Sequence, residues 1–222
     1  MTLAELKSLV KKGEGQHLEF KKKADYPDKI VKEMVAFANS GGGTLLLGVD
    51  DSGQLRGLRY PDEEQFVMEA AISKYARPPI PFQLFSIALG QGVFVLAYLV
   101  ESGKEKPYFW LSDKQNQIFR AFVRSADQSI QASKEMFQVL KQEKIRAAFQ
   151  PFRLNELEKK MLAHFGEKPT MTLNQLVQIG EMPRRKASQM LVNWVRQGVL
   201  QIHPDAREDL YRLSPRYSGE AE

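Results

Sequence analysis

The sequence contains no cysteine and only three histidines in 222 residues. The missing cysteines exclude disulfide scaffolds, cysteine zinc sites, iron–sulfur clusters and thiol catalysis. So few histidines also argue against a metal site built from histidine. The longest purely apolar run is Val93–Val100, far shorter than the roughly 20 residues of a membrane-spanning helix, and the first residues lack the pattern of a secretory signal. We therefore expect a cytoplasmic protein with no membrane partner.

Basic residues outnumber acidic ones, 32 to 27, which gives a net charge of +5. Hydrophobic residues make up 43% and charged residues 27%, as in ordinary globular proteins, and the length allows one or two domains. The basic excess is local, because one cluster lies within residues 7–23 and a second is Arg184-Arg185-Lys186. Local basic clusters indicate a polyanionic partner, of which nucleic acid is the first candidate.

Hydrophobic periodicity predicts an α+β domain over residues 1–150. Helical spacing of apolar residues predicts helices at about 2–12, 27–38, 62–75 and 133–149. Alternating or continuous apolar runs predict strands at 17–21, 44–49, 54–58, 82–89, 93–100 and 119–124. Several of these strands are joined by short turns, and few helices lie between them. This order favours an α+β domain with a mixed sheet over a doubly wound parallel one.

Gln150-Pro151 marks the predicted domain boundary, and residues 151–222 have a different pattern. Apolar residues at helical spacing predict one helix around Leu154–Phe165 and a shorter one around Leu173–Ile179. A third helix begins at Pro183 and ends at Gly198, and two short apolar runs around a polar turn follow it. Three helices and a hairpin in this order are typical of a small winged helix-turn-helix domain.

Two stretches of the first domain, Glu14–Lys21 and Ala36–Asp51, resemble the Schlafen-type AlbA-like domain. The family pattern is a glutamate, four residues and Glu-Phe-Lys, then a helix ending in Ala-Asn, a small residue and two glycines, then Gly-Val-Asp. A later Tyr-Val-Arg corresponds here to Phe122-Val123-Arg124, and the glycine that usually follows is replaced. The resemblance covers about residues 1–145. It implies a domain found in bacterial transcriptional regulators, in divergent ATP-binding proteins and in animal Schlafen proteins, often with a C-terminal winged helix.

The glycine-rich segment Asn39–Gly43 has two interpretations. Glycines let backbone N–H groups converge on an anion, so the segment could cradle a phosphate. A Walker A loop, however, places a lysine after its glycines and ahead of a helix. Here the glycines follow a helix, precede a strand and have no such lysine. We therefore favour a helix C-cap with a tight reversal, and we do not expect ATP as a cofactor.

Glu14, Glu19 and Asp50 are the sharpest group of candidate catalytic residues. Carboxylates brought together can hold Mg²⁺ or Mn²⁺, and these ions stabilise phosphoryl transfer. The resemblance to Schlafen nucleases implies that the three carboxylates are metal ligands and that Lys21 contacts phosphate, with Asp51 competing for the place of Asp50. A homodimer could then supply the second lobe that animal nucleases have. The residue pattern alone favours ordinary strand-face and turn residues.

Arg184, Arg185 and Lys186 are expected in the first turn of the third C-terminal helix, the helix that lies in the major groove in helix-turn-helix proteins. Ser188, Gln189 and Asn193 share its outer side, whereas Trp194 falls on the core side. Arginine and glutamine can read base edges. A solvated charged face, or a winged helix that docks on protein, would fit the same residues.

These patterns together predict a nucleic-acid-binding protein, specifically a DNA-binding transcriptional regulator that uses the winged helix. The alternative is a metal-dependent endoribonuclease of Schlafen type, with RNA as its partner. A third interpretation makes the first domain a sensor of a ligand or partner that acts on the winged helix.

Overall fold

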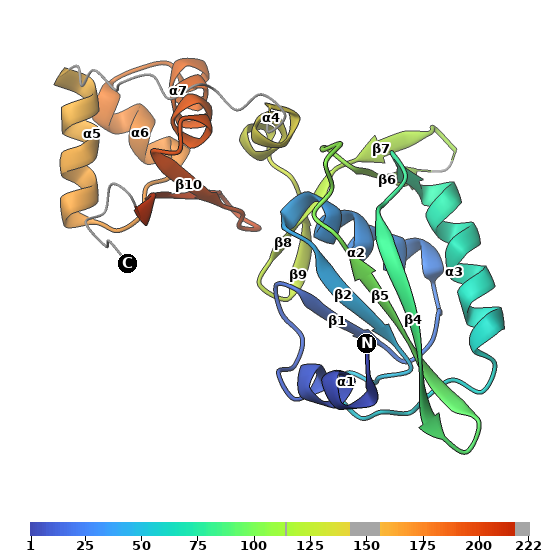
Figure 1. The fold of residues 1–222 in the computed structure, drawn as a ribbon. Coiled ribbons are helices and arrows are strands. Elements are labelled where there is room, and N and C mark those ends of the chain that lie inside the picture. Colours follow the sequence, from blue (N-terminus) through green and yellow to red (C-terminus); the bar gives the residue numbers. More distant parts are fainter. Residues whose placement is uncertain (114, 143–155, 216–222) are drawn as a thin grey trace. The chain divides into compact units, whose positions relative to one another are not determined.

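A computed structural model describes residues 1–113, 115–142 and 156–215 of the chain (Figure 1). Its contacts divide the chain into two compact units, Met1–Gln131 and Ala132–Glu222. The predicted boundary, Gln150-Pro151, lies outside the described residues. Within those residues, no helix is long and apolar enough to cross a membrane.

The first unit is built on a mixed four-stranded sheet with the order β1-β2-β5-β4. β1 and β2 run parallel, whereas β2 pairs with β5 and β5 with β4 in antiparallel register. A parallel pair needs a crossover connection, and helix α2 supplies it here. The predicted mixed-sheet α+β domain is thus confirmed. The strands are β1 (Leu18–Lys21), β2 (Gly43–Leu47), β4 (Phe82–Gly90) and β5 (Val93–Val100).

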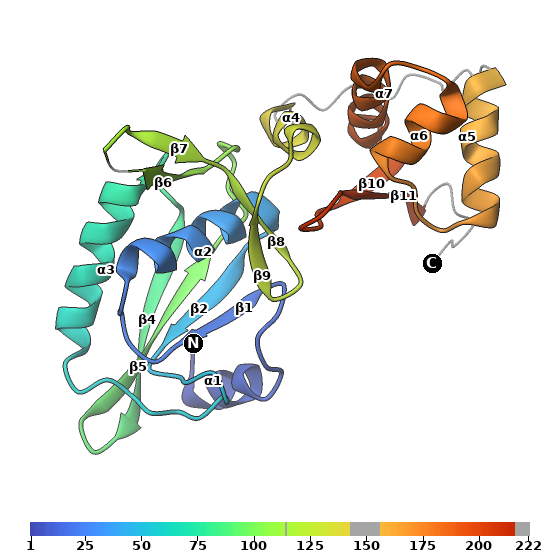
Figure 2. The ribbon, with the colours of Figure 1, turned by 180° about the vertical axis from the view of Figure 1, so that it is seen from behind.

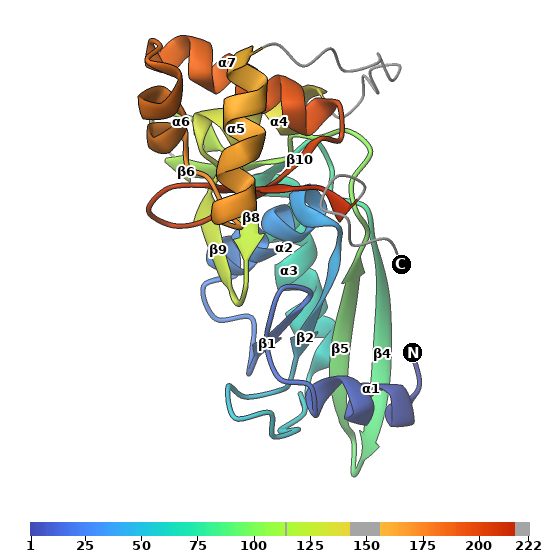
Figure 3. The ribbon, with the colours of Figure 1, turned by 90° about the vertical axis from the view of Figure 1, so that its left-hand side faces the viewer.

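Helices cover both faces of this sheet (Figures 1 and 2). In the buried strand β2, Leu45 and Leu47 join a core cluster with residues of α2 and α3. Leu46 points to the opposite face and joins a smaller cluster with Leu6 of α1, because successive side chains of a strand alternate between its faces. Figure 3 shows α1 beside the sheet near the N-terminus. The helices are α1 (Leu3–Val10), α2 (Pro27–Ser40) and α3 (Pro61–Tyr75).

Two predicted strands differ from the structure. Residues 54–58 form only isolated bridges, Val49 with Leu55 and Leu58 with Phe94. The strand expected over 119–124 is broken at Ala121 into two strands that pair with different partners. The short strands are β3 (Ala76–Arg77), β6 (Phe109–Asp113), β7 (Ile118–Arg120), β8 (Phe122–Ser125) and β9 (Gln128–Gln131). The β8–β9 turn keeps a left-handed residue without glycine, since Ala126 has a φ of 52°.

In the second unit, the described residues 132–142 and 156–215 form four helices and a hairpin. Helices α5, α6 and α7 enclose a core with the buried side chains of Leu176, Leu191 and Trp194, as expected for Trp194. The hairpin β10–β11 closes this core, and Met171, just before α6, forms an antiparallel bridge with Tyr211 of β11. The elements are α4 (Lys134–Gln142), α5 (Glu156–Glu167), α6 (Leu173–Gly180), α7 (Arg184–Arg196), β10 (Leu200–His203) and β11 (Leu210–Leu213).

Candidate functional sites

The buried guanidinium of Arg124 is the centre of a polar network in the first unit. Its side chain is 0% exposed. Nη1 donates to Glu19 Oε2 at 3.2 Å and to Glu33 Oε2 at 2.8 Å, and Nη2 donates to the carbonyl of Gly15 at 2.8 Å. Arginine suits this position because its guanidinium offers several donors in a fixed geometry. The network therefore ties β8 to β1, to α2 and to the loop before β1.

Further contacts fix the arginine and its partners. The Arg124 guanidinium carbon lies 4.8 Å from the centre of the Phe37 ring, within the range of a cation–π interaction. Ser129 of β9 donates a hydrogen bond to Glu33 and accepts one from Arg124 Nη1 at 3.1 Å. On the other side of Glu19, Lys21 Nζ donates to Oε1 at 2.5 Å. Lys32 Nζ lies 3.5 Å from Glu33 Oε1. Two carboxylates and three cations thus share one partly buried site.

Burial raises the pKa of Glu19 above its ordinary value, because removal from water penalises the charged carboxylate. The hydrogen bond from Lys21 and the charges of Lys21 and Arg124 act in the opposite direction, and the charge of Glu33 adds to the increase. Glu19 is therefore held between two cations in a site that disfavours its own charge. Its ionisation depends on both of its partners.

The other two predicted carboxylates, Glu14 and Asp50, accept hydrogen bonds in two different loops. Glu14 Oε1 accepts the backbone N–H of Phe20 at 2.8 Å and so closes the loop that leads into β1. Asp50 Oδ1 accepts the hydroxyl of Ser52 at 2.6 Å and the N–H of Gln54 at 2.9 Å, while Oδ2 accepts from Arg56 at 2.7 Å. The hydrogen bond from Ser52 is the main reason that the pKa of Asp50 lies below its ordinary value, followed by those from Gln54 and Arg56.

The structure does not bring the three carboxylates together. Among the described residues, no three histidine, aspartate or glutamate side chains are grouped as a metal ion would require. Glu14, Glu19 and Asp50 each bind their own protein partners instead, as given above. Lys21 Nζ, the expected phosphate contact, is engaged by Glu19 and by the carbonyl of Phe20 at 2.9 Å. In this structure each of these side chains is bonded to protein groups, and no catalytic step is assigned to them.

The glycine-rich segment ends α2 as the C-cap interpretation predicts. Gly41 is the C-cap residue with a φ of 111°, and its N–H donates to the carbonyl of Phe37. Gly42 allows a close backbone approach, since a Cβ there would lie 2.7 Å from the carbonyl oxygen of Val100. The Gly42 carbonyl is in turn held by His17 Nδ1 at 2.7 Å. These glycines serve the packing of the helix end against β5.

Asn39 and Ser40, just before these glycines, join α2 to distant strands. Asn39 is 2% exposed, and its Nδ2 donates to the carbonyls of Tyr108 at 2.9 Å and Phe122 at 2.8 Å. Its Oδ1 accepts the N–H of Tyr108 at 2.8 Å. Ser40 Oγ accepts the N–H of Arg124 at 2.8 Å. The Ala-Asn-Ser stretch and the Phe-Val-Arg stretch are thus directly bonded to each other.

Three residues at the centre of this network were not among the predicted site residues: Glu33, Arg124 and Ser129. The only signal for Arg124 was its place in the Phe-Val-Arg stretch. Glu33 lies on a helix that was predicted from its apolar residues, and its polar residues gave no motif. Ser129 belongs to no motif of the sequence.

The second candidate site is the polar side of α7. Arg185, Lys186, Gln189 and Asn193 are exposed there, as expected from their offset from the apolar side. Arg184 is also exposed, but its Nη1 donates a hydrogen bond to Asn174 of α6. Within the described part of the chain, neither Arg185 nor Lys186 forms an ion pair. Two cations at the start of α7 therefore remain free for an outside anion.

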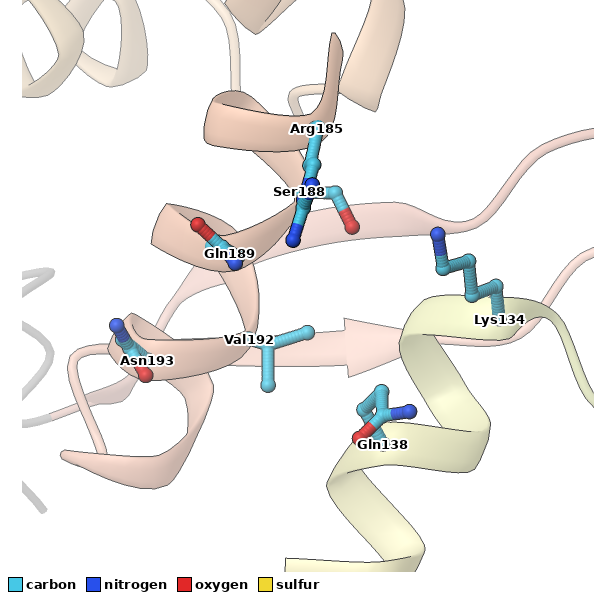
Figure 4. A pocket seen from close by; sticks show the side chains of 7 residues that line it. All are labelled: Lys134, Gln138, Arg185, Ser188, Gln189, Val192 and Asn193. Atoms are coloured by element: carbon cyan, nitrogen blue, oxygen red, sulfur yellow. The ribbon is translucent and has the colours of Figure 1, made fainter.

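Ser188 is placed differently from its predicted outer position. It is half-buried, and its Oγ donates to Glu135 Oε1 of α4 at 2.5 Å. Between the two helices lies a groove of about 470 Å³. Figure 4 shows side chains of both helices around it. The lining residues are Lys134, Gln138, Arg185, Ser188, Gln189, Val192 and Asn193.

The geometry of the first unit defines a mixed-sheet α+β domain in which the motif residues meet around one buried arginine. The Schlafen, AlbA_2 family profile matches residues 14–133, and the chain belongs to this family. No curated protein matches the chain.

Among the solved structures that are similar to this chain are two with 17% and 20% identity. One is the DIP2311 protein from Corynebacterium diphtheriae, 17% identical, with a TM-score of 0.43 over 74% of this chain and 40% of the other. The second is the N-terminal domain of a RecG-related protein from Nitrosomonas europaea, 20% identical, with a TM-score of 0.44 over 70% of this chain and 96% of the other. The chain thus matches less than half of the length of DIP2311.

Proposed function

We propose that this protein binds duplex DNA through α7 and acts as a DNA-binding transcriptional regulator. The observation that carries the proposal is the pair of unpaired cations, Arg185 and Lys186, in the first turn of the second helix of a helix–turn–helix. The turn between α6 and α7 is short, since α6 ends at Gly180 and α7 begins at Arg184. Helices joined in this way present the N-terminal part of the second helix to the major groove.

The side chains of α7 supply two kinds of contact. Arg185 and Lys186 can neutralise phosphates, which gives affinity without sequence preference. Gln189 and Asn193 are exposed one and two turns further on, where their amides can donate to and accept from base edges. The order of α5, α6, α7 and the β10–β11 hairpin supports assigning residues 156–215 to a winged helix-turn-helix.

The loop of the hairpin makes a weaker candidate for phosphate contact than α7. It carries Asp205, Glu208 and Asp209 against a single Arg207. A net negative loop repels a phosphate backbone. We therefore assign the phosphate contacts to the start of α7 and not to the wing.

Removing the two free cations should weaken duplex binding and its salt dependence together. For Arg185→Ala/Lys186→Ala, the slope of log affinity against log salt concentration should fall by about 1.8, because each lost phosphate contact removes about 0.9. Arg184 is left in place because it bonds to Asn174. Fluorescence anisotropy of a labelled duplex between 50 and 300 mM salt, roughly the range in which phosphate contacts dominate, measures this slope.

The matched control is Lys159→Ala/Lys160→Ala, which removes the same charge from exposed positions on α5. This variant should keep the wild-type slope. Equal losses in both variants would mean that net charge, not α7, governs binding, and would contradict the proposal. A duplex RNA of the same sequence should bind more weakly, because side chains cannot read its narrow major groove.

The competing function, a metal-dependent endoribonuclease, stays a prediction from the family resemblance. It requires Glu14, Glu19 and Asp50 around one cation, with Lys21 on phosphate. No arrangement of the described carboxylates favours it. The predicted homodimer likewise stays a prediction.

A further inference from the structure

Helix α4 packs against the side of α7 that carries Ser188 and Val192. The bond from Ser188 to Glu135 links the two helices directly. At the start of α4, Ser133 Oγ accepts the N–H of Met136 at 2.9 Å and donates to Asp209, in the loop before β11. One end of α4 is thus bonded both to α7 and to the hairpin.

Apolar contact accompanies these bonds. Val192 is 6% exposed, yet it is not part of the core cluster that α5, α6, α7 and the hairpin form around Trp194. It lines the groove together with Gln138 of α4, which lies across from it (Figure 4). Leu140 of α4 is buried as well and is equally absent from that cluster. We attribute the burial of Val192 to the docked α4.

The docked helix conflicts in space with recognition in the major groove. The groove of B-DNA is about 12 Å wide and admits one helix. An α-helix with its side chains is already about 10–12 Å across, and packed helices lie about 8–10 Å apart. A helix packed on α7 must therefore stay outside the DNA groove, whereas α4 lies beside the base-reading side, where Gln189 and Asn193 line the space next to Gln138. While α4 covers Ser188 and Val192, α7 cannot enter the groove with this side.

We propose that α4 is an autoinhibitory helix that must leave α7 before the base-reading side chains can enter the DNA major groove. This inference rests on the proposed function, because it concerns how the same helix α7 is regulated. Docked α4 leaves Arg185 and Lys186 exposed, so phosphate contact persists in the inhibited state. The docked state binds duplexes without sequence preference, and the released state adds base contacts.

The released form can be enriched by weakening the two polar bonds of α4. Ser133→Ala/Glu135→Ala removes the bonds to Asp209 and Ser188, and each lost bond changes the docking equilibrium by about threefold to tenfold. Apparent affinity rises with the competent fraction, so binding of a preferred duplex should tighten by at least about tenfold. Binding of a random-sequence duplex pool should change by less than about twofold. The preferred duplex is selected from that pool with the double variant itself.

Because Glu135→Ala also removes a negative charge, the control is Glu167→Ala, an exposed position on α5. It should leave the affinities for both duplexes unchanged within about twofold. An equal gain in Glu167→Ala would mean that charge, not release of α4, raises affinity, and would overturn the proposal. Failure of Ser133→Ala/Glu135→Ala to enrich any sequence would overturn it too.

A reversible lock tests the opposite direction. The chain has no cysteine, so Gln138→Cys/Val192→Cys places a unique thiol pair across the groove. A short bis-methanethiosulfonate linker joins the two thiols, and dithiothreitol removes it. Each single-cysteine variant treated with the reagent controls for modification alone.

The linked protein should bind the preferred duplex no better than the random pool, and dithiothreitol should restore at least about tenfold preference. Equal binding of the preferred duplex before and after linker removal would overturn the proposal. Loss of binding by Arg185→Ala/Lys186→Ala in both linked and unlinked protein tests the proposed function separately. If that variant binds like the wild type, the proposed function has failed, whatever the linker does.

Discussion

Replacing Arg124 by alanine should lower the free energy of unfolding of the first unit by about 3–5 kcal/mol. The substitution removes the cation that Glu19 and Glu33 share in a site where both are largely buried, and leaves each with one partly exposed lysine, Lys21 and Lys32. It also removes the donor to the Gly15 carbonyl and the contact with the Phe37 ring. Removing one partner from a buried ionic network leaves the remaining charges poorly compensated, which explains the size of the effect.

Urea unfolding followed by Trp110 fluorescence measures this effect. The chain has two tryptophans, and Trp110 lies in the first unit, so a Trp194→Phe background makes the signal specific to that unit. Arg120→Ala is the control, since it removes the same charge four residues away from an exposed side chain and should cost less than about 0.5 kcal/mol. Equal losses in the two variants would contradict the role of the buried network.

Asn39→Ala should destabilise the same unit by about 2–4 kcal/mol. The side chain satisfies the N–H of Tyr108 and two carbonyls, and alanine can replace none of these bonds. Each buried backbone group left without a partner costs about 1–3 kcal/mol, and partial access of water reduces the total. The effect is specific to the amide because Asn39→Asp, of nearly the same shape, would point an acceptor at the two carbonyls.

The same urea experiment applies, with Asn116→Ala as control. Asn116 is exposed and bonds only locally, to Asp113. Its loss should cost less than about 0.5 kcal/mol. If Asn39→Ala were as mild as this control, the Asn39 bonds would not hold the end of α2 to the strands around Tyr108 and Phe122.

Local patterns were sufficient to predict much of the first unit. The alternation at Leu18–Phe20, the apolar run of β2 and the turn between β4 and β5 all report how a strand packs, and each is contained in a few residues. The break at Ala121 was not predictable in this way, because the two halves of the apolar run pair with strands from different parts of the chain. Residues 54–58 have a strand-like composition but pair through single bridges only.

The polar network shows why the first site was only partly predictable. The motif residues were identified, but their partners were not, since Arg124 is 105 residues from Glu19 and 91 from Glu33. The sequence pattern of a carboxylate beside a lysine in one strand is the same whether the carboxylate binds a metal ion or a distant arginine. The family resemblance implied metal binding by Glu19. In the tertiary structure, Glu19 is bonded to Lys21 and Arg124 instead.

The helix at residues 133–149 was expected to complete the first domain. Its described part, α4, belongs instead to the second unit. Periodicity shows that a helix has an apolar side but does not show which partner that side covers. Ser188 shows the same limit. The pattern of α7 predicts that it lies away from the apolar side, but it does not predict the contact with Glu135 of α4 that leaves it half-buried.

The central claim, that α7 carries the DNA contact, is tested most directly by NMR of the ¹⁵N-labelled chain titrated with a duplex of about 20 base pairs, long enough for a major-groove site. The account predicts that backbone amide shifts change first and most strongly in Arg184–Asn193. In Arg185→Ala/Lys186→Ala these shift changes should be lost. Shifts confined to the basic segment Lys21–Lys23 of the first unit, with α7 unperturbed, would contradict it.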